Sequence, residues 1–111
     1  MTDKHFLGEF EQMVLLAILR LGETAYAVPI RDEIEGRASR NVARGALYTT
    51  LERLEAKGFL ASRMSDPTPE RGGRSRRYFE VTGEGVQSLR HSHAALHNLS
   101  EGLESVLGDT R

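Results

Sequence analysis

The sequence predicts a mostly helical chain with one small β-hairpin. Apolar residues recur at α-helical spacing in several segments, and two short segments alternate apolar and polar residues as half-buried strands do. The distribution of charge is a third observation. Between residues 37 and 77 the chain carries ten lysines and arginines against four acids, a net charge of +6, although the whole chain carries −1. A basic segment in an otherwise acidic chain is typical of proteins that approach DNA in one orientation.

The first predicted helix covers residues 9–21 and ends before Gly22. It is apolar almost all round, which indicates a helix that is buried on more than one side, in part against a second subunit. A shorter helix is expected over residues 29–36, because Pro suits a first helical turn and Ile30 and Ile34 lie one turn apart. We expect it to be the positioning helix of a helix-turn-helix pair.

A third helix follows, in which Leu47, Leu51 and Leu54 form an apolar stripe and Gly58 ends the helix. Its opposite face is mostly small near the N-terminal end and carries Gly45, Ala46, Thr49 and Arg53. Small side chains let a helix sit close to a major groove, where Thr can meet base edges and Arg can bind guanine. The same pattern also fits an ordinary surface helix with leucines in the core.

Two strands are expected over residues 59–64 and 76–81, joined by the Pro- and Gly-rich sequence SDPTPERGGRS. Such a hairpin forms a wing whose arginines suit phosphates or a narrow minor groove, although a solvated loop is the alternative. Together, the helices and the wing predict a winged helix-turn-helix DNA-binding domain over residues 1–82. The residues expected to contact DNA are Arg44, Gly45, Tyr48, Thr49, Arg53, Arg71, Arg74, Arg76 and Arg77.

A C-terminal helix and tail make up residues 83–111, with Thr82 as the expected N-cap and Gly102 as a bend or a fraying point. Its heptad-like apolar seam, which includes His93 and Ser100, favours a dimerisation arm over a helix folded back on its own domain. A histidine in this seam would make dimer stability depend on pH. The residues expected at the dimer interface are Phe10, Val14, Val86, Leu89, Leu96, Leu103 and Leu107.

These segments resemble the PadR-type winged-helix transcriptional regulators, in particular the small ones with a single C-terminal helix. The resemblance rests on GALYTTLERLEAKGFL and ERGGRSRRYFEVTGEG, which occur in that order. It implies a homodimer whose recognition helices enter successive major grooves of a palindromic operator, with the wings on flanking DNA. The chain departs from the family at Ala43, where a capping Ser is common, and we expect Asn41 to cap the third helix instead. Pro29 is expected to delay the start of the second helix.

Several classes of function are disfavoured. The chain has no Cys, and His91, His93 and His97 lack the further ligands of a metal site, so no metal or cofactor is expected. No catalytic constellation indicates an enzyme. With no membrane-spanning stretch and no signal peptide in the sequence, a cytoplasmic location is expected.

The sequence therefore predicts a sequence-specific regulator of transcription, a repressor that binds double-stranded DNA as a homodimer. A small-molecule effector of unknown identity is a further expected partner, but an aromatic sandwich is not indicated because the chain has no Trp. The alternative is a protein-protein interaction module without DNA binding.

Overall fold

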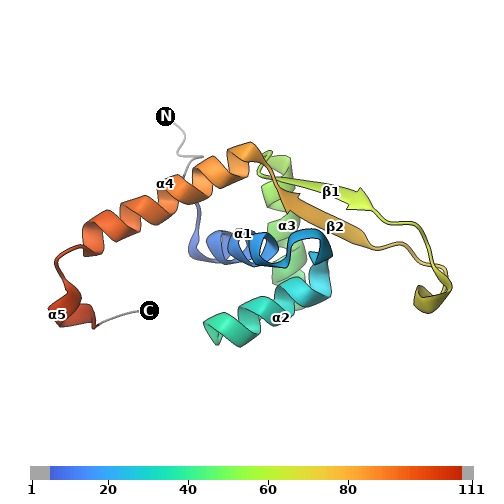
Figure 1. Cartoon of the computed structure of the whole chain (residues 1–111), viewed down its shortest axis with the longest axis horizontal. Helices are drawn as coiled ribbons and strands as arrows, with labels where there is room; N and C mark the ends of the chain where they lie inside the picture. The colour runs from blue at the N-terminus through green and yellow to red at the C-terminus, as the bar shows by residue number, and fades with distance from the viewer. Residues whose placement is uncertain (1–5, 109–111) are drawn as a thin grey trace.

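The structure, a computed structural model, describes residues 6–108 and consists of a helical body from which two extensions project (Figure 1). In chain order the main elements are α1 (Glu9–Leu21), α2 (Ala27–Ala38), α3 (Arg44–Ala56), β1 (Leu60–Met64), β2 (Arg77–Val81), α4 (Gly83–Ser100) and α5 (Glu104–Leu107). Short 3-10 turns occur at Gly22–Thr24 and at Pro69–Arg71. The wing projects at one end of the body, and α4 leads to α5 at the other (Figure 1).

Helix α1 is the centre of the body, because it contacts α2, α3, β2 and α4. Its side chains Val14, Leu15 and Ile18 are at most 2% exposed. The stripe of Leu47, Leu51 and Leu54 predicted for α3 is also buried, at 0–1% exposure. This packing fixes α3 against the body by its apolar side and leaves its opposite side in solvent.

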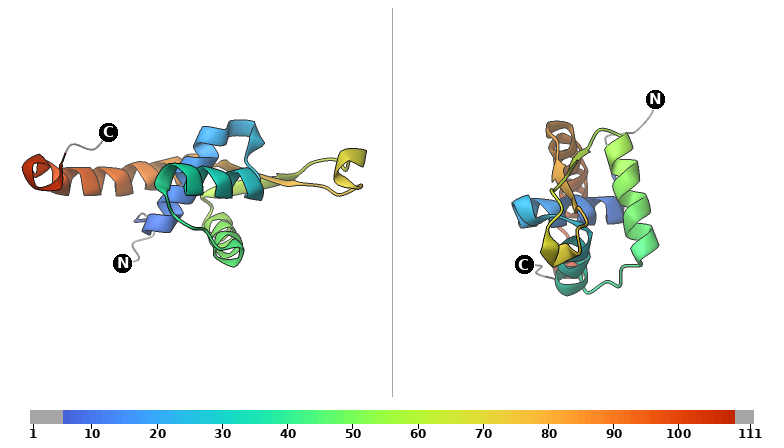
Figure 2. Two further views of the ribbon diagram at one scale, coloured as in Figure 1. Left: turned by 90° about the horizontal axis from the view of Figure 1, so that it is seen from below. Right: turned by 90° about the vertical axis from the view of Figure 1, so that its right-hand side faces the viewer.

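Strands β1 and β2 pair antiparallel, with Leu60 opposite Val81 and Met64 opposite Arg77. The root of this hairpin is held to the body by Phe79, which is 5% exposed and whose backbone N–H donates to the carbonyl of Ala25 at 2.9 Å. The outer part of the hairpin projects from the body as a wing (Figure 1). Figure 2 shows the wing end-on in its right-hand view, and in its left-hand view the wing projects beyond α3.

Thr82 separates β2 from α4 and caps α4 as predicted, because its Oγ1 accepts a hydrogen bond from Gly85 N at 3.0 Å. The first half of α4 packs on α1: Leu89 is 6% exposed, and Ser92 Oγ accepts from Leu7 N at 2.8 Å. Beyond this point the helix leaves the body and its side chains are mostly exposed. The first half of α4 is therefore part of the same packed body as α1.

Three details differ from the sequence-based expectations. Helix α2 begins at Ala27 rather than at Pro29, which is tolerated because the first N–H groups of a helix have no partner within the helix. The N-cap of α3 is Ala43 without a capping side chain, so the expected shift to Asn41 is wrong. Helix α4 ends at Ser100, and Gly102, with a positive φ of +88°, bends the chain after the helix as predicted. The continuous seam expected through Leu103 and Leu107 is therefore broken.

No helix within residues 6–108 is both long enough and apolar enough to cross a bilayer.

Candidate nucleic-acid interface

The exposed side of α3 carries the small and polar residues that the sequence analysis assigned to DNA contact. Gly45, Thr49 and Arg53 are exposed, and Tyr48 keeps 48% of its surface accessible at the edge of this face. The side chain of Arg53 also lies 3.9 Å from Glu11 Oε2, so part of its charge is balanced within the chain. This face is thus both accessible and able to approach a groove closely.

A groove of about 410 Å³ adjoins this face, where α2, α3 and the wing meet. Three guanidinium-bearing residues line it: Arg31 from α2, Arg44 from α3 and Arg74 from the wing. Val28 and Tyr48 supply apolar and aromatic surface beside them. The three arginines come from three elements and give one concave surface positive charge, which suits anionic groups such as backbone phosphates.

Arg31 was missed by the sequence analysis, because its role depends on how α2 lies against α3. Glu35, one turn later, has Oε2 at 3.6 Å from Arg31 Nε, and the same oxygen accepts from Val42 N at 2.9 Å. One carboxylate thus holds both Arg31 and the backbone of the turn that leads into α3. A signal for this residue was the i, i+4 Arg–Glu spacing on a helix that precedes the recognition helix.

The root of the wing is held together by stacked rings and guanidinium groups. The rings of Tyr26 and Tyr78 meet edge-on with centroids 5.5 Å apart. Arg76 lies over Tyr26 at 4.2 Å and Arg63 over Tyr78 at 4.8 Å. These cation-π contacts place Arg76, a predicted DNA contact, against the body at the base of the wing.

Arg77 differs most from its predicted role of DNA contact, because its guanidinium group is directed at α3. Nη1 donates to Glu52 Oε2 at 3.0 Å, Nη2 donates to Glu55 Oε1, and Nε donates to Ser62 Oγ at 3.2 Å. Hydrogen bonding to Glu52 and the charges of Glu55 and Glu52 raise the pKa of Arg77, against the opposing effect of burial. Every guanidinium nitrogen of this residue has a partner within the chain.

Much of the remaining positive charge in the basic segment is also balanced internally. Arg37 Nε lies 2.9 Å from Glu33, and Arg40 Nη1 lies 2.7 Å from Glu9. The charge counted from the sequence therefore overstates what this segment presents to a ligand. Arg44 and Arg74 are exposed and line the groove. The side chain of Arg71 lies outside the described residues.

Glu11 makes the most buried of these ion pairs, at 8% exposure. Its Oε2 accepts from Lys57 Nζ at 2.9 Å, and its Oε1 accepts from Gly8 N at 2.9 Å. Burial opposes ionisation, but the hydrogen bonds from Lys57 and Gly8 and the charges of Lys57 and Arg53 outweigh it and hold the pKa of Glu11 below its ordinary value. This carboxylate joins the start of α1 to the end of α3.

The predicted dimerisation residues divide into two groups. Val14 is 0% exposed and Leu89 is 6% exposed, so both pack inside their own chain and leave almost no surface for contact with a second copy. Phe10 and Val86 are half-buried. Leu96, Leu103 and Leu107 are 47–60% exposed, and the exposed apolar side chains Leu16, Leu19, Leu99 and Val106 accompany them.

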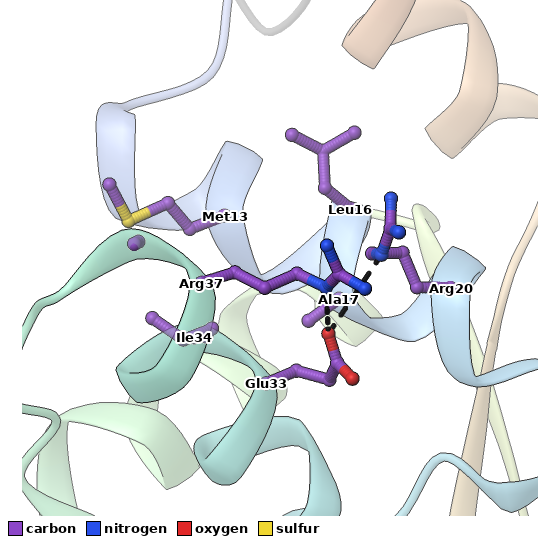
Figure 3. Close-up of a pocket in the computed structure, with 8 residues that line it drawn as sticks. Met13, Leu16, Ala17, Arg20, Glu33, Ile34 and Arg37 are labelled. Carbon is purple, nitrogen blue, oxygen red and sulfur yellow. Dashed lines mark hydrogen bonds and ion pairs between the residues drawn. The ribbon is translucent and has the colours of Figure 1, made fainter. Parts of the chain in front are cut away.

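Two further hollows lie away from the arginine groove. A groove of about 610 Å³ runs between α1 and α4 and is lined by Met13, Leu16 and Leu96, among others. A smaller hollow of about 260 Å³ lies between α1 and α2, where Glu33 Oε1 is shared by Arg37 at 2.9 Å and Arg20 at 3.9 Å (Figure 3). The described residues contain no cluster of three or more His, Asp or Glu side chains that could hold a metal ion.

Comparison with known proteins identifies relatives of this fold. The Transcriptional regulator PadR-like family matches residues 15–91. A PadR-like transcription factor from Bacteroides fragilis is 28% identical with a TM-score of 0.69, over 87% of this chain and 88% of that one. A PadR family regulator from Eggerthella lenta is 28% identical with a TM-score of 0.67, over 92% and 88% of the two chains.

A PadR family regulator from Clostridium difficile shares the fold at 23% identity, with a TM-score of 0.70 over 89% of this chain and 99% of that one. A comparison with curated proteins gave no match. The helix-turn-helix, the wing and the family match over residues 15–91 lead to one conclusion: the chain belongs to the PadR-like family of transcriptional regulators, which bind DNA.

Proposed function

We propose that this protein is a repressor that binds an inverted-repeat operator in double-stranded DNA as a homodimer. The arginine groove carries the proposal, because Arg31, Arg44 and Arg74 meet beside the exposed face of α3. In this arrangement the groove holds backbone phosphates while Thr49 and its neighbours face base edges. A dimer presents two such faces, so its half-sites should lie about 10 bp apart. Occupying that much DNA near a promoter excludes polymerase.

The dimer is supported by apolar surface that one chain leaves uncovered. Leu96 and Leu99 are 60% and 78% exposed, on the part of α4 that has left the body. They adjoin the groove between α1 and α4, whose lining is mainly apolar. We assign this groove to the α4 of a second copy, which places one apolar helix in the groove of the other around a two-fold axis.

Salt titrations of binding to an operator and to a scrambled duplex test the DNA-binding face. Arg74→Ala should weaken binding to both duplexes and reduce the salt slope by about one unit, because one phosphate contact is lost. Thr49→Val keeps the shape but removes a hydroxyl, so it should change operator preference by about 1 kcal/mol at an unchanged slope. An interaction module without DNA binding would leave both variants indistinguishable from the parent.

A footprint on the DNA upstream of the protein's own gene tests the operator geometry. Protection of two symmetric half-sites supports the dimer. Protection of a single half-site, or equal affinity for DNA that carries one half-site and DNA that carries both, contradicts it.

A small-molecule effector is part of the proposal, and the hollow between α1 and α2 is its best-supported site. Met13, Leu16 and Ala17 form apolar surface there, and two arginines share the single carboxylate of Glu33 (Figure 3). This combination suits a small apolar anion. Thermal unfolding with benzoate or hexanoate tests it: a shift in the parent that disappears in Ala38→Leu, an exposed position that lines the hollow, supports the site. An equal shift in both proteins contradicts it.

A further inference from the structure

We infer that Arg77 is a positioning residue that fixes the wing against the recognition helix, rather than a residue that contacts DNA. The inference rests on the proposed DNA-binding function and assigns to the wing a defined angle relative to α3. Arg77 is the first residue of β2, so it lies where the wing leaves the body. From there its guanidinium group reaches back to α3.

The contacts of Arg77 join three elements. Glu52 and Glu55 belong to α3, Ser62 belongs to β1, and Arg77 itself belongs to β2. Ser62 Oγ completes the cluster by donating to Glu55 Oε2 at 2.8 Å. The guanidinium carbon also lies 5.1 Å from the centre of the buried ring of Phe79. A planar guanidinium that is held at several edges has little freedom to rotate, so both strands are oriented relative to α3.

The same cluster also deals with an electrostatic problem. Glu52 is on the flank of the DNA-facing side of α3, and its side chain is 65% exposed. An unpaired carboxylate in that place would repel the phosphates that the arginine groove attracts. Arg77 pairs with both Glu52 and Glu55, so its single positive charge offsets one of the two negative charges on this flank of α3.

A distance measurement in the absence of DNA tests the positioning role directly. The chain has no Cys, so two cysteines can be introduced as the only labelling sites: Ala56→Cys in α3 and Ser75→Cys in the wing. A spin label is attached to each of them. Labelled chain is diluted with unlabelled chain to restrict the signal to distances within one protomer. We expect a narrow distribution for the parent, and a broad or shifted one both for Arg77→Ala and for the Glu52→Gln/Glu55→Gln double variant.

DNA binding provides the second readout, with Arg74→Ala as the matched control. Arg77→Ala should weaken operator binding by roughly tenfold and should lose less salt slope than Arg74→Ala, which should lose about one unit together with its phosphate contact. Adding Glu52→Gln and Glu55→Gln to Arg77→Ala should recover part of the affinity, because the unpaired carboxylates are gone, but it should not restore the narrow distance.

An unchanged distance distribution together with a slope reduced by about one unit in Arg77→Ala would overturn the inference, because it would show that Arg77 contacts a phosphate. If Arg77→Ala does not fold, the double glutamine variant decides the same question from the α3 side, and a narrow distribution in that variant contradicts the inference. If the parent binds no DNA at all, the proposed function fails, while the distance measurement still decides whether Arg77 fixes the wing.

Discussion

At the scale of single residues, Glu11 is the one charged side chain that is buried among the described residues. Glu11→Gln should lower the free energy of unfolding by about 1–3 kcal/mol at neutral pH, because a buried carboxylate and its bond to Lys57 are lost. Urea unfolding measures this change. The control is Glu9→Gln, whose carboxylate is 76% exposed and should contribute less than about 1 kcal/mol.

The pH dependence of this effect follows from the direction of the pKa shift. The folded state holds the pKa of Glu11 below the ordinary value of 4.5. Ionised Glu11 therefore contributes its full stabilisation at pH values above the pKa that this group has in the unfolded chain. This contribution is lost as the pH falls through the folded pKa. The difference between parent and Glu11→Gln should therefore be full at pH 7 and shrink progressively below about pH 4.5. An equal difference at all pH values would contradict the assignment.

Gly85 allows a second residue-scale prediction, because α4 crosses the hairpin at this point. A Cβ atom at Gly85 would lie 2.3 Å from the carbonyl oxygen of Phe59, whereas one at Gly83 would have no neighbour within 4 Å. Gly85→Ala should lower the free energy of unfolding by about 1–3 kcal/mol, because the backbone at Phe59 or at Gly85 must move to make room for the Cβ atom. Gly83→Ala should leave it unchanged or raise it by up to about 1 kcal/mol. Thermal unfolding of the two variants distinguishes these outcomes.

At the scale of elements, the start of α3 is a place where the chain can be made more stable. Ala43 has the extended backbone of an N-cap (φ −72°, ψ 138°) but no side chain that accepts a hydrogen bond. Ala43→Ser should raise the free energy of unfolding by about 1 kcal/mol, and Ala43→Val, which cannot cap, should not. Calorimetry on both variants tests this. Equal stability of Ser and Val variants would show that the cap is satisfied in another way.

The elements themselves were largely predictable from the sequence, because their signals are local. The bounds of α1 match the predicted 9–21, and Leu47, Leu51 and Leu54 are buried as their spacing indicated. Pairings between elements were not predictable in this way. Arg77 was assigned to DNA because the sequence shows a run of basic residues, whereas its partners on α3 lie 22 and 25 positions away along the chain. Only the packed arrangement of hairpin and helix brings them together.

The predicted interface residues show the same difference between local pattern and packing. Val14 and Leu89 fit the apolar spacing of their helices, but the fold uses both inside the body. Leu99 and Val106, which did not fit the heptad pattern, are the most exposed of these side chains at 78% and 79%. A periodic pattern identifies apolar faces, but it does not say which of two partners covers each face.

At the scale of the whole molecule, dimerisation should depend on the exposed apolar side chains of α4. Leu99→Glu should shift the protein from dimer to monomer at micromolar concentration without lowering the stability of the folded chain, because Leu99 is 78% exposed in a single copy. Sedimentation velocity measures the change. Met64→Glu, at an equally apolar position of 61% exposure on β1, serves as control and should remain dimeric. A dimeric Leu99→Glu protein would show that the copies meet elsewhere.

The wing and α4 are consecutive along the chain, with Thr82 alone between them. Its Oγ1 donates to Gly58 O at 2.7 Å and accepts from Gly85 N at 3.0 Å, so the connection is stiff. In the proposed dimer, a rotation of α4 at the subunit interface would therefore be transmitted to β2. The distance between the two wings of such a dimer would then be set by the orientation of α4, at the far end of the molecule. Tolerance of the proposed dimer for operators with altered half-site spacing would then be a property of this one-residue joint.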